Sequence, residues 1–573
     1  MTTTASALRG YNLLIEIESD PRDGREWRFA LAHRTHSVVG APYPRHDGVW
    51  PGIASVRGLR HELGTGGVVV SPAVRIELAR GAEALTDADV ATIRAAEYFV
   101  GRSVRLYLAL SARGVPSADT LVHEGMIERG DVEIGPYTVA ISARDRVERD
   151  NRRIPALAYG DDAKTDPRWS GRAVPVLFGD FGAEQSDYWI EAACVDTQPY
   201  ATDRPLRARL CRPGHYGIAS FGARATWTDS SARPKRDETG YRDFEIGVVD
   251  AAAGTFELVG SEFERMEVRF ESGDEIRVAR PRGERDENGR LIESPVGVIR
   301  HLLTDPVNGL SLSADALDVA SFDSARAWAD AWGYRCRALI DGETTVMDAI
   351  GRIGADFGLC LFVRRGLYTL VPAGGAGSAP VTTVDDARLL DAREWNDLRR
   401  LGGESLALRY RRRPDDGQFT RRVASGAAAP VTLESDWIFD DESARAWLYD
   451  REARFASLRT VRARCDFSLL GARLGDAVSV SGSLGEGVFQ VAAIGIDFDP
   501  PVSVELDLVA RGEAPDAGVW SADAGDPVPT AHGGGVMPAD FAEASAAQRA
   551  ALSFWADAGD ANPDGEALKV WGR

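Results

Sequence analysis

The stretch that decides the fold is Gly101-Arg-Ser-Val-Arg-Leu-Tyr-Leu108, in which apolar and polar residues alternate. The same alternation returns in Tyr137-Thr-Val-Ala-Ile-Ser-Ala-Arg144. Because successive side chains of a strand point to opposite faces of its sheet, this period of two predicts half-buried β-strands. An amphipathic stretch at residues 85–99 predicts one short helix among the strands. Residues 1–150 are therefore expected to form a first β-barrel-like domain.

A second unit, near the other end of the chain, repeats this order of features. It begins with Gly475-Asp-Ala-Val-Ser-Val480, which like the first unit reads as glycine, polar residue, any residue, valine and an alternating strand. The corresponding segments are residues 101–108 and 475–480, then 125–129 and 489–497, and finally 137–144 and 502–511. Chance similarity between alternating strands is the alternative to a true duplication. A duplication predicts a second β-barrel domain at residues 381–512, which also holds a capped helix at residues 440–457.

The chain between these two units changes character twice. Residues 151–292 carry short strands broken by many prolines, glycines and aspartates, which predicts an irregular β-rich domain. Residues 293–380 predict an α+β domain of three helices followed by a hairpin about Arg365-Gly366. The fold class expected for the whole chain is β-rich α+β and multidomain, with the two β-barrel-like domains flanking the irregular and the α+β domains.

The three helices of the α+β domain have distinct start and stop signals. Ser294-Pro295 begins the first helix and Asp305-Pro306 ends it, because proline fits the first turn of a helix but does not continue one. The second helix is expected at residues 322–332. The third starts near Thr345, and Gly358 ends it.

Composition excludes several classes of protein. At roughly 150 residues per domain, 573 residues correspond to about three or four domains, and 44% hydrophobic residues are ample for their cores. The net charge of −20 argues against a dedicated nucleic-acid-binding protein, because such a chain repels polyphosphate. We expect no integral membrane segment, since no apolar run approaches the ~20 residues required, and no secretory leader. The five cysteines are far apart and are expected to be reduced core thiols: Cys194, Cys211, Cys336, Cys360 and Cys465.

Residues 513–573 are rich in alanine, glycine, aspartate and proline and are expected to form an extended C-terminal arm, interrupted only by a short helix near residues 541–554. Disordered tails usually lack large aromatic side chains, but this segment carries several at wide spacing. We expect these side chains to be partner-binding anchors that insert into grooves of a neighbouring chain: Trp520, Phe541, Phe554, Trp555 and Trp571.

Motifs of catalysis and cofactor binding are missing from the sequence. It contains no H-E-x-x-H, G-x-S-x-G, G-x-G-x-x-G or Walker motif, so we expect no cofactor. His33, His36 and His46 could contribute to a metal site, but no carboxylate or cysteine stands at matched spacing, which favours solvated or interface histidines and no metal. His61-Glu62 and His123-Glu124 are His–Glu neighbours, whose side chains would face opposite ways in a strand.

Paired carboxylates could flank a glycosidic bond in a hydrolase, and three pairs occur, at residues 161–162, 385–386 and 440–441. Their positions in turns and before helices favour capping instead, so the chain is expected not to be an enzyme. Trp328 and Trp332 stand four residues apart on an apolar helix face, which favours core packing over sugar binding. The arginines at residues 411–413 and 421–422 read as an interface loop or a solvated face, because no aromatic residues are interleaved with them.

Three stretches resemble tail-tip or baseplate hub proteins of long-tailed bacteriophages, including the hub part of tail-tip attachment proteins and of gene transfer agents. Ala173-Val-Pro-Val-Leu-Phe-Gly-Asp180 is similar to the Pro-Val-x-Phe-Gly segment that follows their first domain. Residues 294–309 resemble their unit of helix, leucine pair and short glycine turn, and Leu474-Gly-Asp-Ala-Val478 resembles the entry to their closing barrel. The resemblance extends, in order, over residues 10–512.

This resemblance implies a structural virion protein of the tail tip, made in the host cytoplasm. It implies a homotrimeric ring that adapts a hexameric tail tube or distal tail protein to tip or fibre proteins, the latter bound through the C-terminal arm. Genomic DNA would pass through the ring without specific binding, past acidic walls. The chain lacks the long fibronectin-like and fibre regions of larger tail-tip proteins, which argues against direct receptor binding. The alternatives are a hub-associated enzyme that degrades peptidoglycan or surface polysaccharide, and the hub of a cellular contractile injection system.

Overall fold

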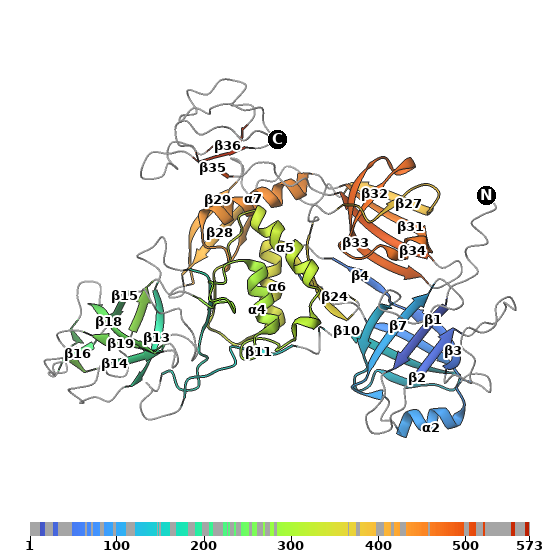
Figure 1. Ribbon diagram of the computed structural model, residues 1–573, viewed down its shortest axis with the longest axis horizontal. Helices are drawn as coiled ribbons and strands as arrows, with labels where there is room; N and C mark the ends of the chain where they lie inside the picture. The colour runs from blue at the N-terminus through green and yellow to red at the C-terminus, as the bar shows by residue number, and fades with distance from the viewer. Residues whose placement is uncertain are drawn as a thin grey trace.

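The structure is a computed structural model. It describes residues 12–17, 27–31, 49–63, 66–69, 73–80, 85–95, 99–109, 121–145, 147, 151–160, 168–180, 189–196, 206–209, 222–225, 227–229, 234–235, 242–250, 255–259, 268–269, 276–279, 283–364, 366–373, 379–396, 406–413, 417–424, 431–456, 459–497, 503–510, 519–521, 552–555 and 568–571. Figure 1 separates these residues into a first domain, a six-stranded barrel, a central unit, a C-terminal sheet and a small terminal sheet. The β-rich α+β class is confirmed.

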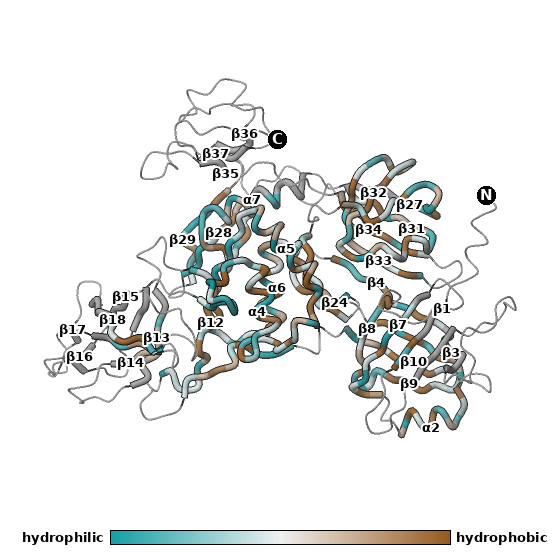
Figure 2. The backbone as a smooth tube through the Cα atoms, viewed as in Figure 1, coloured by the Kyte–Doolittle hydropathy of each residue, from teal (hydrophilic) through white to brown (hydrophobic). Residues whose placement is uncertain are grey.

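The first domain is one sheet whose strand pairing returns to its start. Its strands are β1 (Asn12–Ile17), β2 (Trp27–Leu31), β3 (Val49–Arg57), β6 (Val74–Ala79), β7 (Ser103–Ala109), β8 (Leu121–Met126), β9 (Val132–Ile134) and β10 (Thr138–Asp145). They lie in the order β6-β3-β2-β1-β7-β8-β10-β9, and β10 also pairs with β6. The alternation places Val104 and Leu106 in the core, as the period of two predicts. Where the strands of this domain are coloured in Figure 2, as in β8 and β10, hydrophobic and hydrophilic residues alternate.

The predicted short helix is α2 (Asp87–Ala95). Thr86 and Asp89 form a reciprocal cap at its start: the Asp89 carboxylate accepts from the Thr86 main-chain N–H at 2.9 Å, and the Thr86 hydroxyl accepts from the Asp89 N–H at 3.3 Å. Val90 and Ile93 are its buried residues and face the core of the first domain.

The middle of the chain differs from the irregular domain expected there. Strands β13 (Trp189–Asp196), β14 (Leu206–Arg209), β15 (Gly222–Ala225), β18 (Arg242–Asp250), β19 (Thr255–Val259) and β21 (Ile276–Ala279) form a closed barrel. A small sheet of β16 (Trp227–Asp229), β17 (Pro234–Lys235) and β20 (Val268–Arg269) accompanies it. Most of these strands are too short to show alternation, and alanines such as Ala193 and Ala208 fill its interior with little hydropathy signal.

The six-stranded barrel is an insertion into the central unit. β11 (Arg153–Ile154) precedes the barrel and pairs with β23 (Thr344–Thr345), while β12 (Val176–Phe178) pairs with β22 (Ala338–Ile340). Directly after the barrel, the Gly283 N–H donates to the Gly179 carbonyl at 2.8 Å. The chain therefore leaves and re-enters the central unit at neighbouring points.

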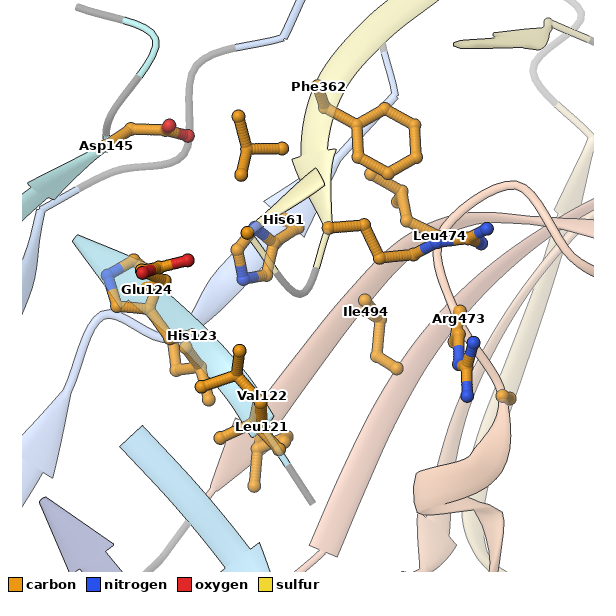
Figure 3. A pocket seen from close by; sticks show the side chains of 16 residues that line it. His61, Leu121, Val122, His123, Glu124, Asp145, Phe362, Arg473, Leu474 and Ile494 are labelled. Carbon is orange, nitrogen blue, oxygen red and sulfur yellow. The ribbon is translucent and has the colours of Figure 1, made fainter. Parts of the chain in front are cut away.

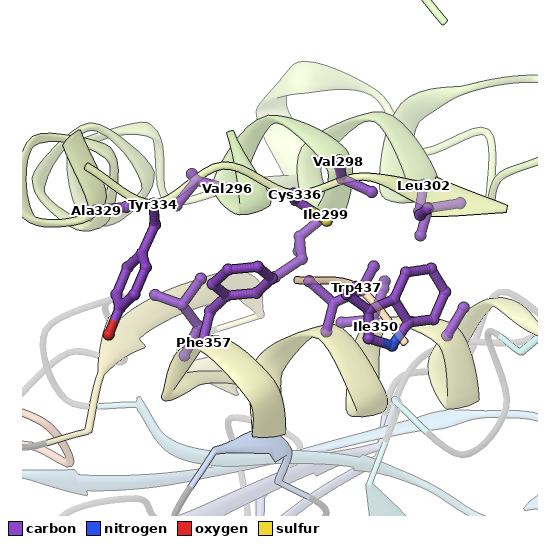
Figure 4. Packing of buried hydrophobic residues seen from close by; sticks show 14 of the residues in the cluster. Val296, Val298, Ile299, Leu302, Ala329, Tyr334, Cys336, Ile350, Phe357 and Trp437 are labelled. Atoms are coloured by element: carbon purple, nitrogen blue, oxygen red, sulfur yellow. The ribbon is translucent and has the colours of Figure 1, made fainter. Parts of the chain in front are cut away.

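The central unit contains the predicted helices and hairpin. These are α4 (Pro295–Thr304), α5 (Val319–Ala331), α6 (Val346–Phe357), β24 (Leu359–Arg364) and β25 (Leu367–Pro372), with a 3-10 turn η3 (Ala314–Ala316). Thr345 caps α6, its hydroxyl accepting from the Asp348 N–H at 3.1 Å, and Gly358 ends it at φ +66°. Figure 4 shows Phe357 and Ile350 of α6 facing Ile299 of α4 across the core.

Part of the region expected in the second barrel belongs instead to the central unit. β28 (Leu406–Arg412), β29 (Phe419–Ala424), β30 (Val431–Glu434) and α7 (Asp441–Ala456) form a layer whose buried residues join the core of α4 to α6. Of the arginines expected on an interface loop or a solvated face, Arg411 and Arg412 therefore end β28, and Arg421 and Arg422 lie in β29. The expected core role of Trp328 is confirmed, since it is buried there, and Trp332 packs partly buried against the same core.

The C-terminal sheet runs in the order β26-β32-β33-β34-β31-β27. Its strands are β26 (Thr382–Val384), β27 (Leu389–Asn396), β31 (Arg459–Asp466), β32 (Ala477–Val480), β33 (Gly487–Asp497) and β34 (Ser503–Ala510), with short 3-10 turns η4 (Phe467–Gly471) and η5 (Gly482–Leu484). Its two edge strands, β26 and β27, are consecutive in the chain and joined by residues 385–388.

Three short strands follow in the segment expected to be an extended arm. β35 (Val519–Ser521), β36 (Leu552–Trp555) and β37 (Leu568–Trp571) pair in the order β35-β37-β36, so the segment folds back on itself at these residues. The helix considered near residues 541–554 is wrong at residues 552–554, which are strand. None of the helices in the described ranges is long and apolar enough to cross a membrane.

Candidate functional site

The feature that joins the parts of the molecule is an excursion from the first domain, residues 58–69, which we call the clasp. It leaves the domain between β3 and β6 and contains β4 (Arg60–Glu62) and β5 (Gly67–Val68). Gly58 opens the clasp at φ +84°, and a Cβ there would lie 2.9 Å from the Ala73 carbonyl oxygen. Glycine therefore allows both the left-handed conformation and the close approach of the two ends of the excursion.

One half of the clasp adds a strand to the C-terminal sheet. β4 pairs with β33 in antiparallel register, with His61 opposite Ile494, and Figure 1 shows it between the two sheets. The Leu63 N–H donates to the Ala492 carbonyl at 2.6 Å, and the Ile496 N–H donates to the Leu59 carbonyl at 3.0 Å. These bonds extend the sheet with main chain from a distant part of the sequence.

An arginine pair reinforces this contact. Arg60 reaches the Asp507 carboxylate at 2.7 Å, and Arg462 donates to both oxygens of the same carboxylate at 2.6 and 2.8 Å. Asp507 thus accepts from two guanidinium groups, one on the clasp and one on β31, which is the bidentate geometry that arginine favours.

The other half of the clasp packs on the central unit. β5 pairs in parallel with β24, and the Val69 N–H donates to the Leu361 carbonyl at 2.8 Å. Beside this pairing, Gly67 lies against Gly351 and Gly354 of α6. A Cβ on Gly354 would lie 2.8 Å from the Cα of Gly67 and 2.5 Å from the Leu359 carbonyl oxygen. The two backbones meet at a distance that only glycine permits.

A cavity lies where the clasp, the first domain, the central hairpin and the C-terminal sheet meet (Figure 3). Its apolar walls include Leu121, Val122, Phe362, Leu474 and Ile494. Its polar lining consists of His61, His123, Glu124, Asp145, Arg364 and Arg473. Every unit of the molecule except the six-stranded barrel and the small terminal sheet contributes to this lining.

Two histidines of the cavity come from separate parts of the first domain and lie next to each other. The ring centroids of His61 and His123 are 5.9 Å apart. His123 is only 4% exposed; it hydrogen-bonds to the main chain of Ala143, and its Nε2 has no hydrogen-bond partner among the described residues. Burial, together with the neighbouring His61, lowers the pKa of His123 to about 3. Burial also lowers the pKa of His61, and the charge of Asp145 partly opposes this shift.

The charged groups around the cavity are held by ion pairs. Glu124 accepts from Arg105 at 3.0 Å, and Arg364 reaches Asp318 at 2.8 Å. Over the described ranges, no three histidine, cysteine or carboxylate side chains are placed to hold a metal ion. The arrangement holds domains together, with two neutral imidazoles at its centre, and offers no activated nucleophile.

The predicted anchor residues are only partly described. Trp520 lies in β35, Phe554 and Trp555 in β36, and Trp571 in β37, so the structure brings four of the five onto one small sheet. Phe541 lies outside the described residues, as do His33, His36 and His46 of the metal-site alternative.

The paired carboxylates that the structure describes act as caps. Asp386 accepts from the Ser483 N–H at 3.0 Å, and Asp440 accepts from the Ser443 N–H at 2.8 Å at the start of α7. Asp441 accepts from the Tyr410 hydroxyl at 2.7 Å. The third pair, residues 161–162, lies outside the described residues. Cys336, Cys360 and Cys465 are buried thiols that form no disulfide, as expected.

Two of the stretches that carry the sequence resemblance are packing motifs. In the first, Gly179 follows the end of β12, and its φ of +82° and missing side chain leave room for Arg337. In the second, the Asp305 carboxylate accepts from the Asn308 N–H at 2.6 Å, and Asn308 in turn accepts from the Ala156 N–H at 3.0 Å. Both motifs hold the segment that precedes the six-stranded barrel against the central unit.

The pairing of His61 with His123 escaped the sequence analysis, which considered each histidine only with the glutamate that follows it. They meet because β4 folds over the end of the first domain, a long-range arrangement that spacing does not reveal. The available signal was the glycine density of residues 58–67, which predicts a turn but not its destination.

No protein-family model matches the chain, and no curated protein matches its sequence. Among solved structures, the chain is similar to a tail protein from Neisseria meningitidis MC58, with 10% identity, 88% of this chain and 97% of that chain covered, and a TM-score of 0.36. It is similar to the 43 kDa tail protein of prophage MuSo2 from Shewanella oneidensis, with 9% identity, coverage of 87% and 98%, and a TM-score of 0.37.

A chain of the native gene transfer agent virion matches with 14% identity, coverage of 63% and 90%, and a TM-score of 0.33. The matched proteins are tail and virion proteins, the class that the sequence resembles. Such TM-scores describe likeness in parts rather than in overall arrangement, so they assign no role to any residue of this chain.

Proposed function

We propose that this chain is a structural protein of a phage-type tail tip or baseplate, located in the virion. Three copies would form a ring that presents six related β-modules to a hexameric tail tube and connects it to tip or fibre proteins. The observation that carries the proposal is a shared strand topology in the first domain and the C-terminal sheet, which agrees with the sequence repeat.

The two modules can be compared strand by strand. In chain order, β3, β6, β7, β8 and β10 of the first domain correspond to β27, β31, β32, β33 and β34 of the C-terminal sheet. In space the neighbours are β3-β6-β10-β8-β7 and β27-β31-β34-β33-β32, and every pairing in both series is antiparallel. A helix, α2 in one and η4 in the other, lies between the second and third strands of each series. This agreement supports a duplication.

In both modules, the chain makes its long excursion at the same point of the strand series. The connection between the first two strands of the series is the clasp in the first domain, and it is the segment carrying β28 to β30 and α7 in the second. Both excursions pack on the central unit, through β5 on β24 and through the shared core of α7. An insertion at the same point of both modules supports a common design.

A ring of three such chains can imitate six subunits only if the two modules in each chain keep a fixed angle. The clasp supplies this rigidity, because one short excursion contacts the C-terminal sheet through main-chain hydrogen bonds and the central unit through a glycine contact. A variable angle between the two modules would weaken every contact between the ring and the tail tube.

The proposal extends to the C-terminal segment and to DNA. Residues 513–573, with Trp520, Phe541, Phe554, Trp555 and Trp571 as anchors, would bind a fibre or tip protein. The net charge of −20 suits a ring through which DNA slides without specific binding. The capping roles of Asp386 and Asp440 support a structural protein rather than a hydrolase.

The experiment is a native mass measurement combined with negative-stain class averages of the purified full chain. We expect a mass of three chains and averages with six similar densities around a central opening. A monomer or dimer over the whole accessible concentration range would contradict the proposal. Zymography on peptidoglycan and capsular polysaccharide tests the enzymatic alternative, for which we expect no clearing.

A further inference from the structure

We propose that the junction beneath the clasp is an acid-sensitive latch, closed while His61 and His123 are neutral and released from the C-terminal sheet when they are protonated. The inference goes beyond the assembly of a ring, because it concerns a motion within one chain. It rests on two neighbouring imidazoles, His61 on the three-residue strand β4 that joins two sheets and His123 on β8 of the first domain.

The surroundings of His123 accept a neutral ring and oppose a charged one. Its Nε2 lies close to the main chain of Gly125, since a Cβ placed on this glycine would be only 2.8 Å from the Nε2 atom. A second proton would occupy this Nε2, which finds no acceptor in the described part of the chain. An unpaired buried charge costs several kcal/mol, so the closed junction excludes the proton.

The groups that face the two rings do not compensate for this cost. Burial opposes a charge on His61 more strongly than Asp145 on β10 favours one. Glu124 on β8 is engaged by Arg105 of β7. The hairpin contributes Arg364 and the entry to β32 contributes Arg473, both cationic. Beside His61 on β4, Arg60 and Glu62 lie 3.8 Å apart and pair with each other.

The direction and size of the effect follow from linkage. The pKa of His123 is about 3 in the closed junction and near 6.5 when the ring is in water, so only the open form binds the proton between these values. Lowering the pH from 8 to 5 therefore favours opening by about thirty-fold through His123 alone. His61 acts in the same direction.

The clasp is the part of the junction that would release first. β4 is joined to β33 over three register pairs, whereas β33 and β34 are paired over eight. Short pairings with few hydrogen bonds open with a lower free energy than the sheets they join. Protonation therefore frees β4 while the two sheets stay folded.

Hydrogen–deuterium exchange of the full chain tests the latch, with protection factors corrected for the intrinsic exchange rate at each pH. We expect protection of residues 59–63 and 492–496 to fall about thirty-fold or more between pH 8 and pH 5, while α6 stays protected. His123→Gln removes the titrating group but keeps a neutral donor toward Ala143, so its protection should be nearly independent of pH.

The matched control is His301→Gln, because His301 is a partly buried histidine, 3.3 Å from Glu284 in the central unit and away from the clasp. It should lose protection at the clasp as the unchanged chain does. The latch is refuted if His123→Gln loses as much protection as the unchanged chain, or if α6 exchanges together with the clasp. If His123→Gln does not fold, His123→Asn and the comparison of the clasp with α6 in the unchanged chain decide the question.

Discussion

Single glycines determine whether the clasp can dock. Replacing Gly354 by alanine within a helix normally stabilises a protein by about 0.5–1 kcal/mol. Here the new Cβ would lie 2.5 Å from the Leu359 carbonyl oxygen and 2.8 Å from the Cα of Gly67, so the end of α6 and the clasp must move apart. We expect Gly354→Ala to lower stability by about 1–3 kcal/mol in chemical denaturation. Gly342→Ala is the control, since nothing lies within 4 Å of its Cβ position, and an equal loss there would contradict the glycine contact.

A buried carboxyl group in the central unit predicts a pH dependence of opposite sign to that of the latch. Burial raises the pKa of Asp356 to about 7, although the hydrogen bond from Ser435 and the charge of Arg451 oppose this. The folded chain therefore holds a proton that the unfolded chain releases above pH 3.8, and stability falls as the pH rises toward 7.

Asp356→Asn should remove this dependence. We expect the variant to be more stable than the unchanged chain by roughly 1–3 kcal/mol at pH 8 and equally stable near pH 4, as measured by denaturant unfolding at both values. Asp323→Asn, at an exposed position of α5, should change neither value. An Asp356→Asn variant that is less stable at pH 8 would show that the ionised group is needed.

At the scale of elements, local signals explain which parts of the fold were predictable. α4 and α6 were expected almost at their observed bounds because Pro295, Thr345 and Gly358 mark their ends. The six-stranded barrel was not, because its strands are short and its interior is partly alanine. β29 escaped because its exposed arginines hide the alternation. The clasp depends on contacts between distant residues, which no local pattern encodes.

The six-stranded barrel should be removable, because its two connections to the central unit lie side by side. The Gly283 N–H donates to the Gly179 carbonyl at 2.8 Å, and the Glu284 N–H donates to the Leu177 carbonyl at 2.7 Å. We expect a chain in which a short Gly/Ser linker replaces residues 181–281 to fold, with near-UV circular dichroism bands from the central tryptophans and a single melting transition. Aggregation of this chain would contradict an inserted barrel. Removal of residues 59–72, which deletes the clasp strands, is the comparison. We expect this deletion to uncouple the first domain from the other units.

At the scale of the whole molecule, the topology separates the small terminal sheet from the other sheets. The first domain, the central unit and the C-terminal sheet are joined by the clasp and by shared cores. Within the described ranges, β35, β36 and β37 pair with one another and not with any strand of these units. This separation is what the proposed attachment role of the terminal segment requires.

This division predicts the result of truncation. A chain ending at residue 512 should melt within about 2 °C of the full chain, because no residue after 510 belongs to a described core cluster and lost surface contacts typically cost under 0.5 kcal/mol. It should also keep the oligomeric mass of the full chain, since the proposed ring contacts involve the two modules. The full chain carrying Trp520→Ala and Trp571→Ala is the companion variant, which keeps the length but removes two anchors. If the truncated chain fails to fold, the segment is part of a core, and the anchors then stabilise this chain instead of binding a neighbour.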